Sequence, residues 1–364
     1  MKMVITAGGT GGHIYPALAI IDYFKKQEKD FEVLYIGTHN RMETKIVPEK
    51  NIPYKGIKIY GFSKKDIKRD FLNIGYIIKS YNELINIFKK FSPDVVVGVG
   101  GYVTFPVILA AKKCHIKTVI HEQNSIPGKT NKFLSKGVDK VFLSFKESEK
   151  YFKKGTNLVY TGNPSGDSVL NSKSIKKETL GFSSDKKFII ITSGSLGSST
   201  LNKKLIEFLK LSKDENYEVL FITGESNYET ITKNNKFSKN IKVVPYFDNL
   251  SHLLSSSDLI ITRAGASTIS EIINAKVPAI LIPSPYVANN HQYYNALDLY
   301  NSNKALMIEE KELDSNELYK KVVELLKNNN KEYARIKNNL LKEKSINSSE
   351  IIYKEIKELI NESK

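Results

Sequence analysis

The chain carries a glycine-rich run near its start, Gly8-Gly9-Thr10-Gly11-Gly12, which ends in His13. The run follows an apolar, β-branched stretch at 3–7 that predicts a strand, and it precedes a predicted helix over 16–29 with Pro16 in its first turn. Glycines in such a loop remove side chains that would block a ligand, and they permit positive φ. A strand, a glycine loop and a helix together bring backbone N–H groups close to a phosphate. The run therefore predicts a phosphate-binding loop with an imidazole at its exit.

The loop is not of the dinucleotide-binding type. Counted from Gly9 and Gly11, the third glycine position of the fingerprint G-x-G-x-x-G is Ile14. The next predicted strand, at 32–37, is followed by threonine and histidine, and not by the acidic residue that binds a ribose. His13 alone is equally compatible with a solvent-facing residue at a helix start and with a catalytic group.

Five further segments rich in small or polar residues follow predicted strands, and they lie at 100–106, 121–124, 193–198, 263–271 and 289–296. The carboxyl ends of parallel strands meet at one edge of a sheet, which is where α/β proteins bind ligands. With the first glycine run there are three such loops in each half of the chain. Their shared placement predicts a cleft that binds a phosphorylated polar ligand.

Most of these segments also have an interpretation that needs no ligand. The turn at 100–106 is typical of a tight strand-to-helix connection, and 289–296 of an exposed polar first turn. Thr268 and Glu271 have the spacing of a capping box, although Glu271 is also placed to accept bonds from two ribose hydroxyls. The four polar residues at 121–124 favour a ligand, and they are not H-E-x-x-H, so they do not indicate zinc.

Composition bounds the remaining possibilities. The 364 residues, 41% hydrophobic and 26% charged, suffice for two domains of about 150 to 200 residues each. A single cysteine, Cys114, excludes a disulfide framework. Because the N-terminus enters a predicted strand at once, we expect no signal peptide, and no apolar run approaches the roughly 20 residues that span a bilayer. No Asp-x-Asp pair occurs, so neither a metal-held nucleotide sugar nor another cofactor is expected.

The net charge of +16 has three candidate explanations: nucleic acid, an anionic membrane surface, or a general lysine bias. The lysines are scattered and no nucleic-acid module is recognisable, so no nucleic-acid partner is expected. Bias and a membrane surface stay open on these grounds.

Alternation of strands and helices predicts an α/β fold with parallel sheets covered on both faces. The first half has predicted strands at 3–7, 32–37, 94–99, 117–121, 139–143 and 157–161, with helices at 16–29, 41–50, 71–91, 103–113 and 127–136. A polar segment at 162–187 is interpreted as an interdomain linker. The second half has predicted strands at 188–192, 217–223, 241–244, 258–262, 278–282 and 304–307, and a helical tail follows residue 312.

Seven motifs follow one another along the chain: Gly8–His13, Gly100–Val103, His121–Asn124, Gly162–Pro164, Gly194–Gly197, Gly265–Glu271 and Asn290–Gln292. In type and order they resemble the motifs of the bacterial MurG family, and the resemblance covers residue 3 to about 310. The resemblance implies the GT-B glycosyltransferase fold, two doubly wound Rossmann-like domains that face each other across a cleft. It implies an N-terminal acceptor and membrane-facing domain at 1–163 and a C-terminal donor domain at 164–344. A final helix at about 345–364 would pack back on the first domain.

The same resemblance implies an inverting transfer of N-acetylglucosamine from UDP-N-acetylglucosamine. The acceptor would be the muramoyl 4-hydroxyl of undecaprenyl-diphospho-muramoyl-pentapeptide, so that lipid I becomes lipid II for peptidoglycan synthesis. The partners implied are UDP-N-acetylglucosamine, lipid I, the anionic inner-leaflet membrane surface and other cell-wall synthesis proteins. The implied location is the cytoplasmic face of the cell membrane, as a peripheral protein.

By the family pattern, His13 is the candidate catalytic base. Within the donor site, Phe247 pairs with uracil through its backbone, Glu271 holds the ribose and Gln292 reads the sugar. The full set of donor-binding positions is Thr10, Gly11, Gly12, Asn124, Gly166, Ser195, Phe247, Ala266, Ser267, Thr268, Ile269, Ser270, Glu271 and Gln292. The acceptor and its diphosphate are assigned to Gly9, Gly101, Tyr102 and Glu122.

Two positions depart from the family pattern. Gly166 stands where Gly-Asn-Pro-x-Arg usually ends in arginine, which predicts a donor contact that is lost or replaced by a nearby lysine, and that Gly166→Arg should restore. Ser193 stands where a glycine is usual. Two other interpretations stay open: a different GT-B enzyme, such as a glycolipid glucosyltransferase or a UDP-N-acetylglucosamine epimerase, and a non-catalytic membrane scaffold.

Residues 59–91 supply a candidate membrane surface. Apolar residues interleave with a basic cluster there, and apolar residues further along recur at helical spacing and are expected to face the core. The cluster is Lys64, Lys65, Lys68 and Arg69, the interleaved residues are Phe62, Ile67, Phe71, Leu72 and Ile74, and the core-facing ones are Tyr81, Leu84, Ile85 and Phe88. A solvated loop whose lysines reflect composition is the alternative.

Overall fold

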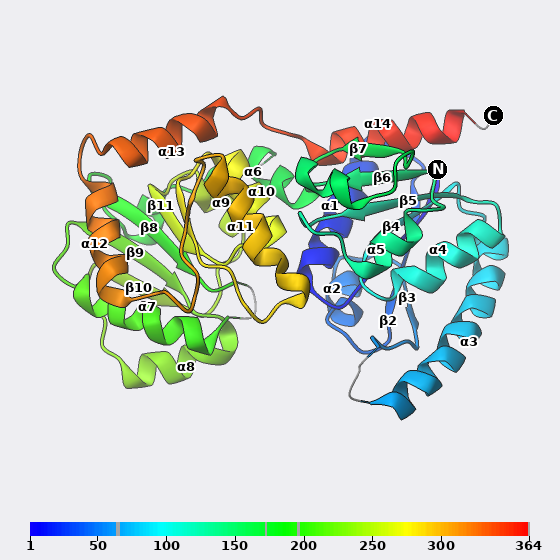
Figure 1. Ribbon diagram of the computed structural model, residues 1–364, viewed down its shortest axis with the longest axis horizontal. Coiled ribbons are helices and arrows are strands. Elements are labelled where there is room, and N and C mark those ends of the chain that lie inside the picture. Colours follow the sequence, from blue (N-terminus) through cyan, green and yellow to red (C-terminus); the bar gives the residue numbers. More distant parts are fainter. Residues whose placement is uncertain (63–65, 172, 195–196, 363–364) are drawn as a thin grey trace. The chain divides into compact units, whose positions relative to one another are not determined.

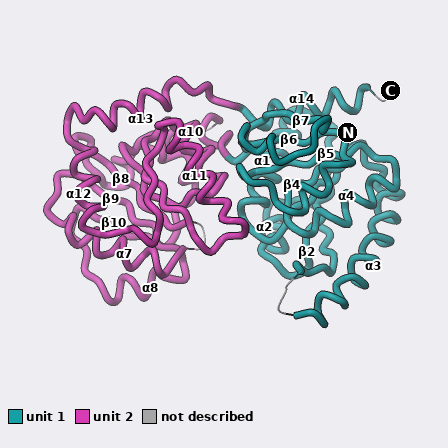
Figure 2. Tube along the Cα trace, in the orientation of Figure 1, with its two compact units in different colours: residues 1–165, 347–364 teal, residues 166–346 magenta. Residues whose placement is uncertain are grey.

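The computed structural model describes residues 1–62, 66–171, 173–194 and 197–362. The chain forms two compact units, residues 1–165 with 347–364 and residues 166–346 (Figure 2). Each unit has its own parallel sheet with helices packed on it. Two doubly wound parallel sheets confirm the predicted fold class.

The sheet of the first unit has seven strands in the order β3-β2-β1-β4-β5-β6-β7, and every neighbouring pair is parallel (Figure 1). The strands are β1 (Lys2–Ala7), β2 (Glu32–Thr38), β3 (Tyr54–Ile57), β4 (Val95–Gly100), β5 (Lys117–Glu122), β6 (Lys140–Leu143) and β7 (Leu158–Tyr160). All six residues of β4 are buried, as its continuous apolar run predicts. The sequence pattern misses β3, because only Ile57 of this edge strand is buried and no apolar run marks it.

The helices of the first unit are α1 (Gly11–Gln27), α2 (Glu43–Glu49), α3 (Ile67–Phe91), α4 (Thr104–Lys113), α5 (Lys129–Leu134) and α14 (Ser348–Asn361), and a 3₁₀ turn, η1 (Lys146–Tyr151), follows β6. α14 lies along α1 (Figure 1). Its Ile352, Ile356 and Leu359 are buried in the same hydrophobic core as the inner face of α1. The end of the chain therefore completes the first unit.

Two helices of this unit begin earlier than the sequence pattern predicts. α1 starts at Gly11, ahead of Pro16, because Thr10 O accepts from the N–H groups of His13 and Ile14. α3 starts at Ile67, where Asp66 caps the helix by accepting from the Arg69 N–H. Glycine is a weak helix former, so apolar periodicity does not mark the first turn of α1. The glycine run therefore contributes the N-terminal turn of a helix as well as a loop.

The sheet of the second unit has six parallel strands in the order β10-β9-β8-β11-β12-β13. The strands are β8 (Lys187–Thr192), β9 (Tyr217–Ile222), β10 (Ile241–Val244), β11 (Leu259–Thr262), β12 (Ala279–Leu281) and β13 (Leu306–Met307). The helices are α6 (Asp167–Leu170), α7 (Ser199–Leu211), α8 (Glu225–Asn234), α9 (Leu250–Leu254), α10 (Ala266–Ala275), α11 (His291–Asn301), α12 (Ser315–Leu326) and α13 (Lys331–Lys342). Short 3₁₀ turns are η3 (Lys177–Leu180) and η4 (Ala288–Asn290), and η2 (Pro164–Gly166) lies where the chain passes from the first unit to the second.

The segment at 162–187, expected to be a linker, has structure of its own. Residues 162–167 are all buried, and α6 packs against α10 within the second unit. The ring of Phe182 lies 4.7 Å from that of Phe188. The polar composition of this segment reflects short helical turns, which resemble a flexible connection in sequence alone.

Within the described ranges, no helix combines the length and apolar content needed to cross a bilayer.

Candidate functional site

The first turn of α1 lies at the carboxyl end of β1. N–H groups in the first turn of a helix have no partner within the helix, and the helix dipole favours an anion there. Thr10 and Gly12 are exposed and Gly11 is half-buried, so these three residues are accessible to a phosphate. Gly9 differs from them, because its N–H donates to Glu43 Oε2 at 3.2 Å.

His13 is half-buried in this first turn. Its Nδ1 lies 3.1 Å from Gly8 O and 3.4 Å from Thr10 Oγ1. A carbonyl oxygen can only accept, so Nδ1 is the nitrogen that carries the proton. A neutral ring in this tautomer has its lone pair on Nε2, which is the form a general base requires.

The turn after β4 packs directly against the glycine run. Gly8 N donates to Gly100 O at 3.2 Å. A Cβ at Gly101 would lie 2.5 Å from Gly8 O, and one at Gly100 would lie 2.6 Å from His13 Cδ2. These glycines are thus required by loop packing, whether or not a ligand binds. Tyr102, next in the chain, is half-buried, and its hydroxyl has no hydrogen-bond partner among the described residues.

Three of the four polar side chains at 121–124 hold the loops of the first unit together. His121 Nε2 donates to Gly162 O at 3.0 Å, and its Nδ1 accepts from Gln123 Nε2 at 2.9 Å. Burial lowers the pKa of His121 to about 4, so the ring is neutral at physiological pH. Gln123 Nε2 also donates to Val99 O at 2.6 Å, at the end of β4. Asn124 is only half-buried.

Glu122 is buried and both its oxygens are engaged. Oε1 accepts from Asn124 N at 3.0 Å, and Oε2 accepts from Gly128 N at 3.0 Å and Asn131 Nδ2 at 2.9 Å. Burial raises the pKa of Glu122, and these hydrogen bonds oppose that effect. The carboxylate therefore shapes the loop that carries Asn124.

In the second unit, α10 begins directly after β11 with Gly265 as its N-cap and no side chain capping it. Thr268 is the third residue of the helix, so Thr268 and Glu271 do not form the capping box that their spacing allows. The first-turn N–H groups face the carboxyl end of the sheet, where an anion would bind. Ser267, Thr268 and Ser270 are half-buried, whereas Ala266 and Ile269 are buried, so the latter two can offer a ligand only their backbone.

Glu271 lies one turn further into α10 and is half-buried. Loss of hydration raises its pKa to about 8. A carboxyl group with this pKa changes its charge close to neutral pH. It is a functional-site candidate, because hydroxyl donors from a ligand would stabilise the charged form.

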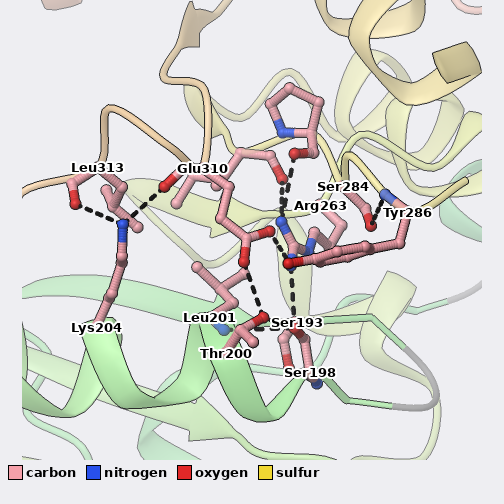
Figure 3. A network of polar contacts seen from close by, with 12 residues as sticks. Ser193, Ser198, Thr200, Leu201, Lys204, Arg263, Ser284, Tyr286, Glu310 and Leu313 are labelled. Carbon is pink, nitrogen blue, oxygen red and sulfur yellow. Dashed lines mark hydrogen bonds and ion pairs between the residues drawn. The ribbon is translucent and has the colours of Figure 1, made fainter.

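Arg263 joins the loops at the carboxyl edge of the second sheet (Figure 3). Its Nη1 donates to Ile282 O at 3.1 Å and Pro283 O at 3.3 Å, in the loop after β12. Its Nη2 donates to Ser198 Oγ at 3.0 Å, at the start of α7. The same Nη2 lies 2.7 Å from Glu310 Oε2, and both side chains of this ion pair are more than 90% buried.

Glu310 extends the network to the loop after β13 (Figure 3). Its Oε1 accepts from Thr200 Oγ1 at 2.8 Å, and its backbone carbonyl accepts from Lys204 Nζ at 2.7 Å. Arg263 and Glu310 thus tie together loops that follow β8, β11, β12 and β13. Neither residue was predicted from the sequence to have a role: Arg263 begins the polar segment at 263–271, and Glu310 lies in a segment without any motif.

The other predicted donor residues lie around this edge. Gln292 Oε1 accepts from Ser284 N at 2.9 Å, which leaves the amide NH₂ as the group of this side chain that can donate to a sugar. Phe247 is half-buried in the loop after β10. Ser195 lies outside the described residues. Ser193 Oγ donates to Asn202 Oδ1 and accepts from Ser198 N, so the serine at the usual glycine position braces the loop.

Gly166 is buried against α10. A Cβ there would lie 3.0 Å from both Ser270 O and Ser270 Cβ, and Gly166 O accepts from Asn274 Nδ2 at 2.9 Å. An arginine at this position would push against the helix that begins the candidate donor site. We therefore revise the expectation that Gly166→Arg simply restores a donor contact. In this chain α6 packs closely on α10, and the contact leaves little space for a side chain at Gly166.

No group of three or more His, Cys, Asp or Glu residues within the described ranges is placed to hold a metal ion.

Comparisons with known proteins identify the class. Residues 3–143 match the glycosyltransferase family 28 N-terminal domain, and residues 188–350 match the glycosyltransferase family 28 C-terminal domain. A curated relative from Thermoanaerobacter sp. (strain X514) is 43% identical over 99% of this chain and 100% of its own length. It is named UDP-N-acetylglucosamine--N-acetylmuramyl-(pentapeptide) pyrophosphoryl-undecaprenol N-acetylglucosamine transferase.

The crystal structure of Acinetobacter baumannii MurG is similar to this chain with a TM-score of 0.78 and 27% identity, covering 98% of this chain and 99% of that one. A Neisseria meningitidis UDP-GlcNAc 2-epimerase bound to UDP-GlcNAc has a TM-score of 0.68 at 16% identity, covering 98% of this chain and 100% of that one, and shares the fold alone. The chain belongs to the MurG family of glycosyltransferases, which confirms the resemblance seen in its motifs.

Proposed function

We propose that this chain transfers N-acetylglucosamine from UDP-N-acetylglucosamine to the muramoyl 4-hydroxyl of undecaprenyl-diphospho-muramoyl-pentapeptide and so forms lipid II. The observation that carries the proposal is 43% identity across 99% of the chain to a transferase whose name specifies this donor and acceptor. The site geometry of each unit supports it independently.

In the proposed mechanism the acceptor binds the first unit, at residues 1–163 by the sequence assignment. His13 Nε2 takes the proton of the 4-hydroxyl as its oxygen attacks C1 of the donor sugar. The bond between C1 and the UDP oxygen breaks, so UDP leaves with the bonding electrons and the new glycosidic bond is β. The Nδ1–H···O=C bond to Gly8 supports this role, because it keeps Nε2 unprotonated in the neutral ring.

The donor is assigned to the second unit, at residues 164–344 by the sequence assignment. The first-turn N–H groups of α10 and the hydroxyls of Ser267, Thr268 and Ser270 bind its diphosphate and stabilise the departing UDP. Glu271 accepts from the ribose, Gln292 donates to the sugar, and the backbone at Phe247 pairs with uracil. Thr10, Gly11, Gly12 and Asn124 are proposed to add contacts from the first unit. Ser195 is proposed to bind the diphosphate.

The acceptor diphosphate is assigned to the glycine turns of the first unit. Gly101 and Tyr102 are both half-buried, and they are proposed to contact the diphosphate through their backbone, since the Tyr102 hydroxyl itself is buried. Gly9 and Glu122 are proposed to act by shaping the loops, since their polar groups are already engaged within the unit.

The test is UDP release from UDP-N-acetylglucosamine, measured with and without a soluble lipid I analogue. Transfer predicts release that depends on the acceptor. Release that is equal without acceptor would indicate hydrolysis, and formation of an epimeric UDP-sugar with no UDP release would indicate an epimerase. A chain that binds UDP but gives neither product would be a scaffold.

The N-terminal half of α3 supports docking on an anionic membrane surface, because its polarity is inverted. Asn73 and Ser80 face inward: Asn73 Oδ1 accepts from Tyr60 N at 2.8 Å, and Ser80 Oγ donates to Lys58 O at 3.4 Å. Several apolar residues face outward, with Ile67 79% and Phe71 78% exposed. Exposed apolar residues also include Phe62, Leu72, Ile74 and Ile78. An exposed apolar face of this kind is typical of interfacial helices.

The other half of α3 has the ordinary polarity. Leu84 and Phe88 are buried, and Tyr81 and Ile85 pack against the same core. Lys68 and Arg69 are exposed beside the apolar face, while Lys64 and Lys65 of the basic cluster lie outside the described residues. We propose that this face binds the inner leaflet of the cell membrane from the cytoplasmic side, with other cell-wall synthesis proteins as further partners.

Vesicle co-sedimentation tests the docking face. Binding to vesicles containing anionic lipid should weaken as salt rises, because each basic residue contributes about 1 kcal/mol near such a surface. Replacing Lys68 and Arg69 with serine should reduce binding more than replacing Lys89 and Lys90, which are exposed at the other end of the same helix. Phe71→Ser should reduce binding without changing its salt dependence. Equal binding by all variants would place the membrane face elsewhere.

A further inference from the structure

Glu43 is a buried carboxylate that the mechanism above does not use. It lies in the first turn of α2, and its side chain has no exposed surface. Oε1 accepts from the Thr38 hydroxyl at 2.6 Å and from Thr38 N at 3.1 Å, and Oε2 accepts from Gly9 N at 3.2 Å. A buried carboxylate is costly unless it is well hydrogen-bonded, and here one of its bonds reaches into the glycine run.

The Gly9 N–H and the Gly8 C=O belong to the same peptide group. Glu43 accepts from one end of this group, and His13 Nδ1 donates to the other end at 3.1 Å. A carboxylate bound to the N–H polarises the peptide and makes its carbonyl oxygen a stronger acceptor. The stronger acceptor in turn favours the His13 tautomer with the proton on Nδ1.

The packing around this peptide leaves it little freedom. Gly8 N donates to Gly100 O at 3.2 Å, and a Cβ on Gly101 would lie 2.5 Å from Gly8 O. A Cβ on Gly8 itself would lie 2.6 Å from Glu43 Oε1. The carboxylate, the peptide and the imidazole are therefore held in one orientation by their surroundings.

We propose that Glu43 is a positioning residue for the transfer reaction, which orients and polarises His13 through the Gly8–Gly9 peptide group. The inference rests on the proposed role of His13 as the base. Glu43 contacts no substrate in this account, and it acts by fixing which imidazole nitrogen carries the proton.

Titratable side chains on neighbouring elements also face this arrangement. His121, which faces His13, is kept neutral because burial lowers its pKa to about 4. Tyr35 and Tyr54, on the strands packed against Glu43, have their pKa raised by burial and further by the Glu43 charge, so both stay protonated. Tyr35 donates to Ala7 O and Tyr54 to Thr38 O, which braces the two chain segments that Glu43 connects.

The experiment combines nitrogen NMR of the histidine rings with kinetics, using Glu43→Gln and a matched control, Thr38→Val. The chain has six histidines, so single substitutions can assign the His13 signals. The wild type should show the Nδ1–H tautomer. Glu43→Gln should increase the Nε2–H tautomer and lower kcat about tenfold or more, with the KM for UDP-N-acetylglucosamine within twofold. Thr38→Val removes a bond to the same carboxylate but should leave the tautomer and kcat close to wild type.

Three results would overturn the inference. One is an Nε2–H tautomer in the wild type, which can be observed even if Glu43→Gln does not fold. Another is an unchanged tautomer and kcat in Glu43→Gln. The last is an equal change in Thr38→Val, which would mean that packing alone is responsible. Because the NMR measurement needs no substrate, it separates this inference from the proposed function, whose own failure would appear as a lack of transfer by the wild type.

Discussion

At the carboxyl edges of the two sheets, buried side chains of opposite charge bind the loop backbone. In the first unit, buried carboxylates bind backbone N–H groups: Glu43 takes that of Gly9, and Glu122 takes those of Asn124 and Gly128. In the second unit, the buried guanidinium of Arg263 binds backbone carbonyls of the loop after β12. The charged side chains of the first edge thus bind N–H donors, whereas the guanidinium of the second edge binds carbonyl acceptors.

This difference fits the two halves of the proposed reaction. In the second unit the guanidinium occupies carbonyl groups, and the N–H groups in the first turn of α10 can bind a diphosphate. In the first unit, the N–H groups that bind carboxylates are not available to the acceptor diphosphate assigned to this edge. The first turn of α1 is then the part of the first unit best suited to a phosphate.

The largest expected effect comes from breaking the Arg263–Glu310 ion pair of the second unit. Arg263→Ala leaves Glu310 as a buried charge without its partner, which should lower the free energy of unfolding by about 3–5 kcal/mol. Denaturant unfolding measures this value. The double variant Arg263→Met, Glu310→Leu should recover most of the loss. If Arg263→Ala lowers the free energy of unfolding by less than about 1 kcal/mol, the value typical of an exposed pair, the ion pair does not hold these loops together.

In the first unit, His13→Ala should act on chemistry. We expect kcat to fall about 100-fold or more, the usual range for loss of a general base, with little change in the KM for UDP-N-acetylglucosamine. Steady-state kinetics with a lipid I analogue measures both constants, and a thermal melt checks that the variant is folded. Near-normal turnover would remove His13 from the mechanism.

Glu271→Ala should act on donor binding. Losing a charged contact to the ribose costs about 1.5–3 kcal/mol, so the KM for UDP-N-acetylglucosamine should rise roughly 10- to 100-fold. Calorimetric titration with UDP provides the matching affinity. An unchanged KM in a folded variant would show that the ribose lies elsewhere.

Gly166→Arg tests how closely α10 packs against the chain at Gly166. Because a Cβ at this position would meet Ser270 at 3.0 Å, the substitution should destabilise the chain by about 1–3 kcal/mol, as overpacking does, and should weaken UDP binding by moving the helix. Denaturant unfolding and UDP titration measure the two effects. A stable variant with a lower KM would restore the interpretation based on the family arginine.

The smallest effect is a pH dependence confined to the second unit. Desolvation raises the pKa of Glu271 to about 8, so the carboxyl is mostly neutral at pH 7 and mostly charged at pH 9. Since ribose hydroxyls donate best to the charged form, UDP affinity should increase about tenfold over this range. Glu271→Gln cannot titrate and should show a flat profile. A wild-type profile equally flat would contradict the ribose contact.

The sequence predicted the strands that carry continuous apolar runs and the polar loops that follow them. Residues 95–99 illustrate this, because burial on both faces leaves a direct mark on residue type. The edge strand β3 left no such mark. The first turns of α1 and α3 were also missed, because a glycine-rich first turn and an inverted polarity both break the usual helical pattern.

Side-chain partnerships between distant segments were beyond sequence reasoning. Nothing near Glu43 indicates that it binds Gly9, and nothing near Glu310 indicates Arg263, because these pairs form only when the fold brings their loops together. The polar residues at 121–124 show the converse limit. Their types suggested a ligand, yet His121, Glu122 and Gln123 are buried in an internal network, and residue types alone do not separate these two uses.

Product analysis tests the central claim most directly. The wild-type chain would be incubated with UDP-N-acetylglucosamine and a short-chain lipid I analogue, and the products examined by mass spectrometry and proton NMR. The account predicts an acceptor heavier by one N-acetylglucosamine residue, a β configuration at the new anomeric carbon, and one UDP released for each acceptor modified. An α linkage, or an unmodified acceptor beside an epimerised UDP-sugar, would contradict it.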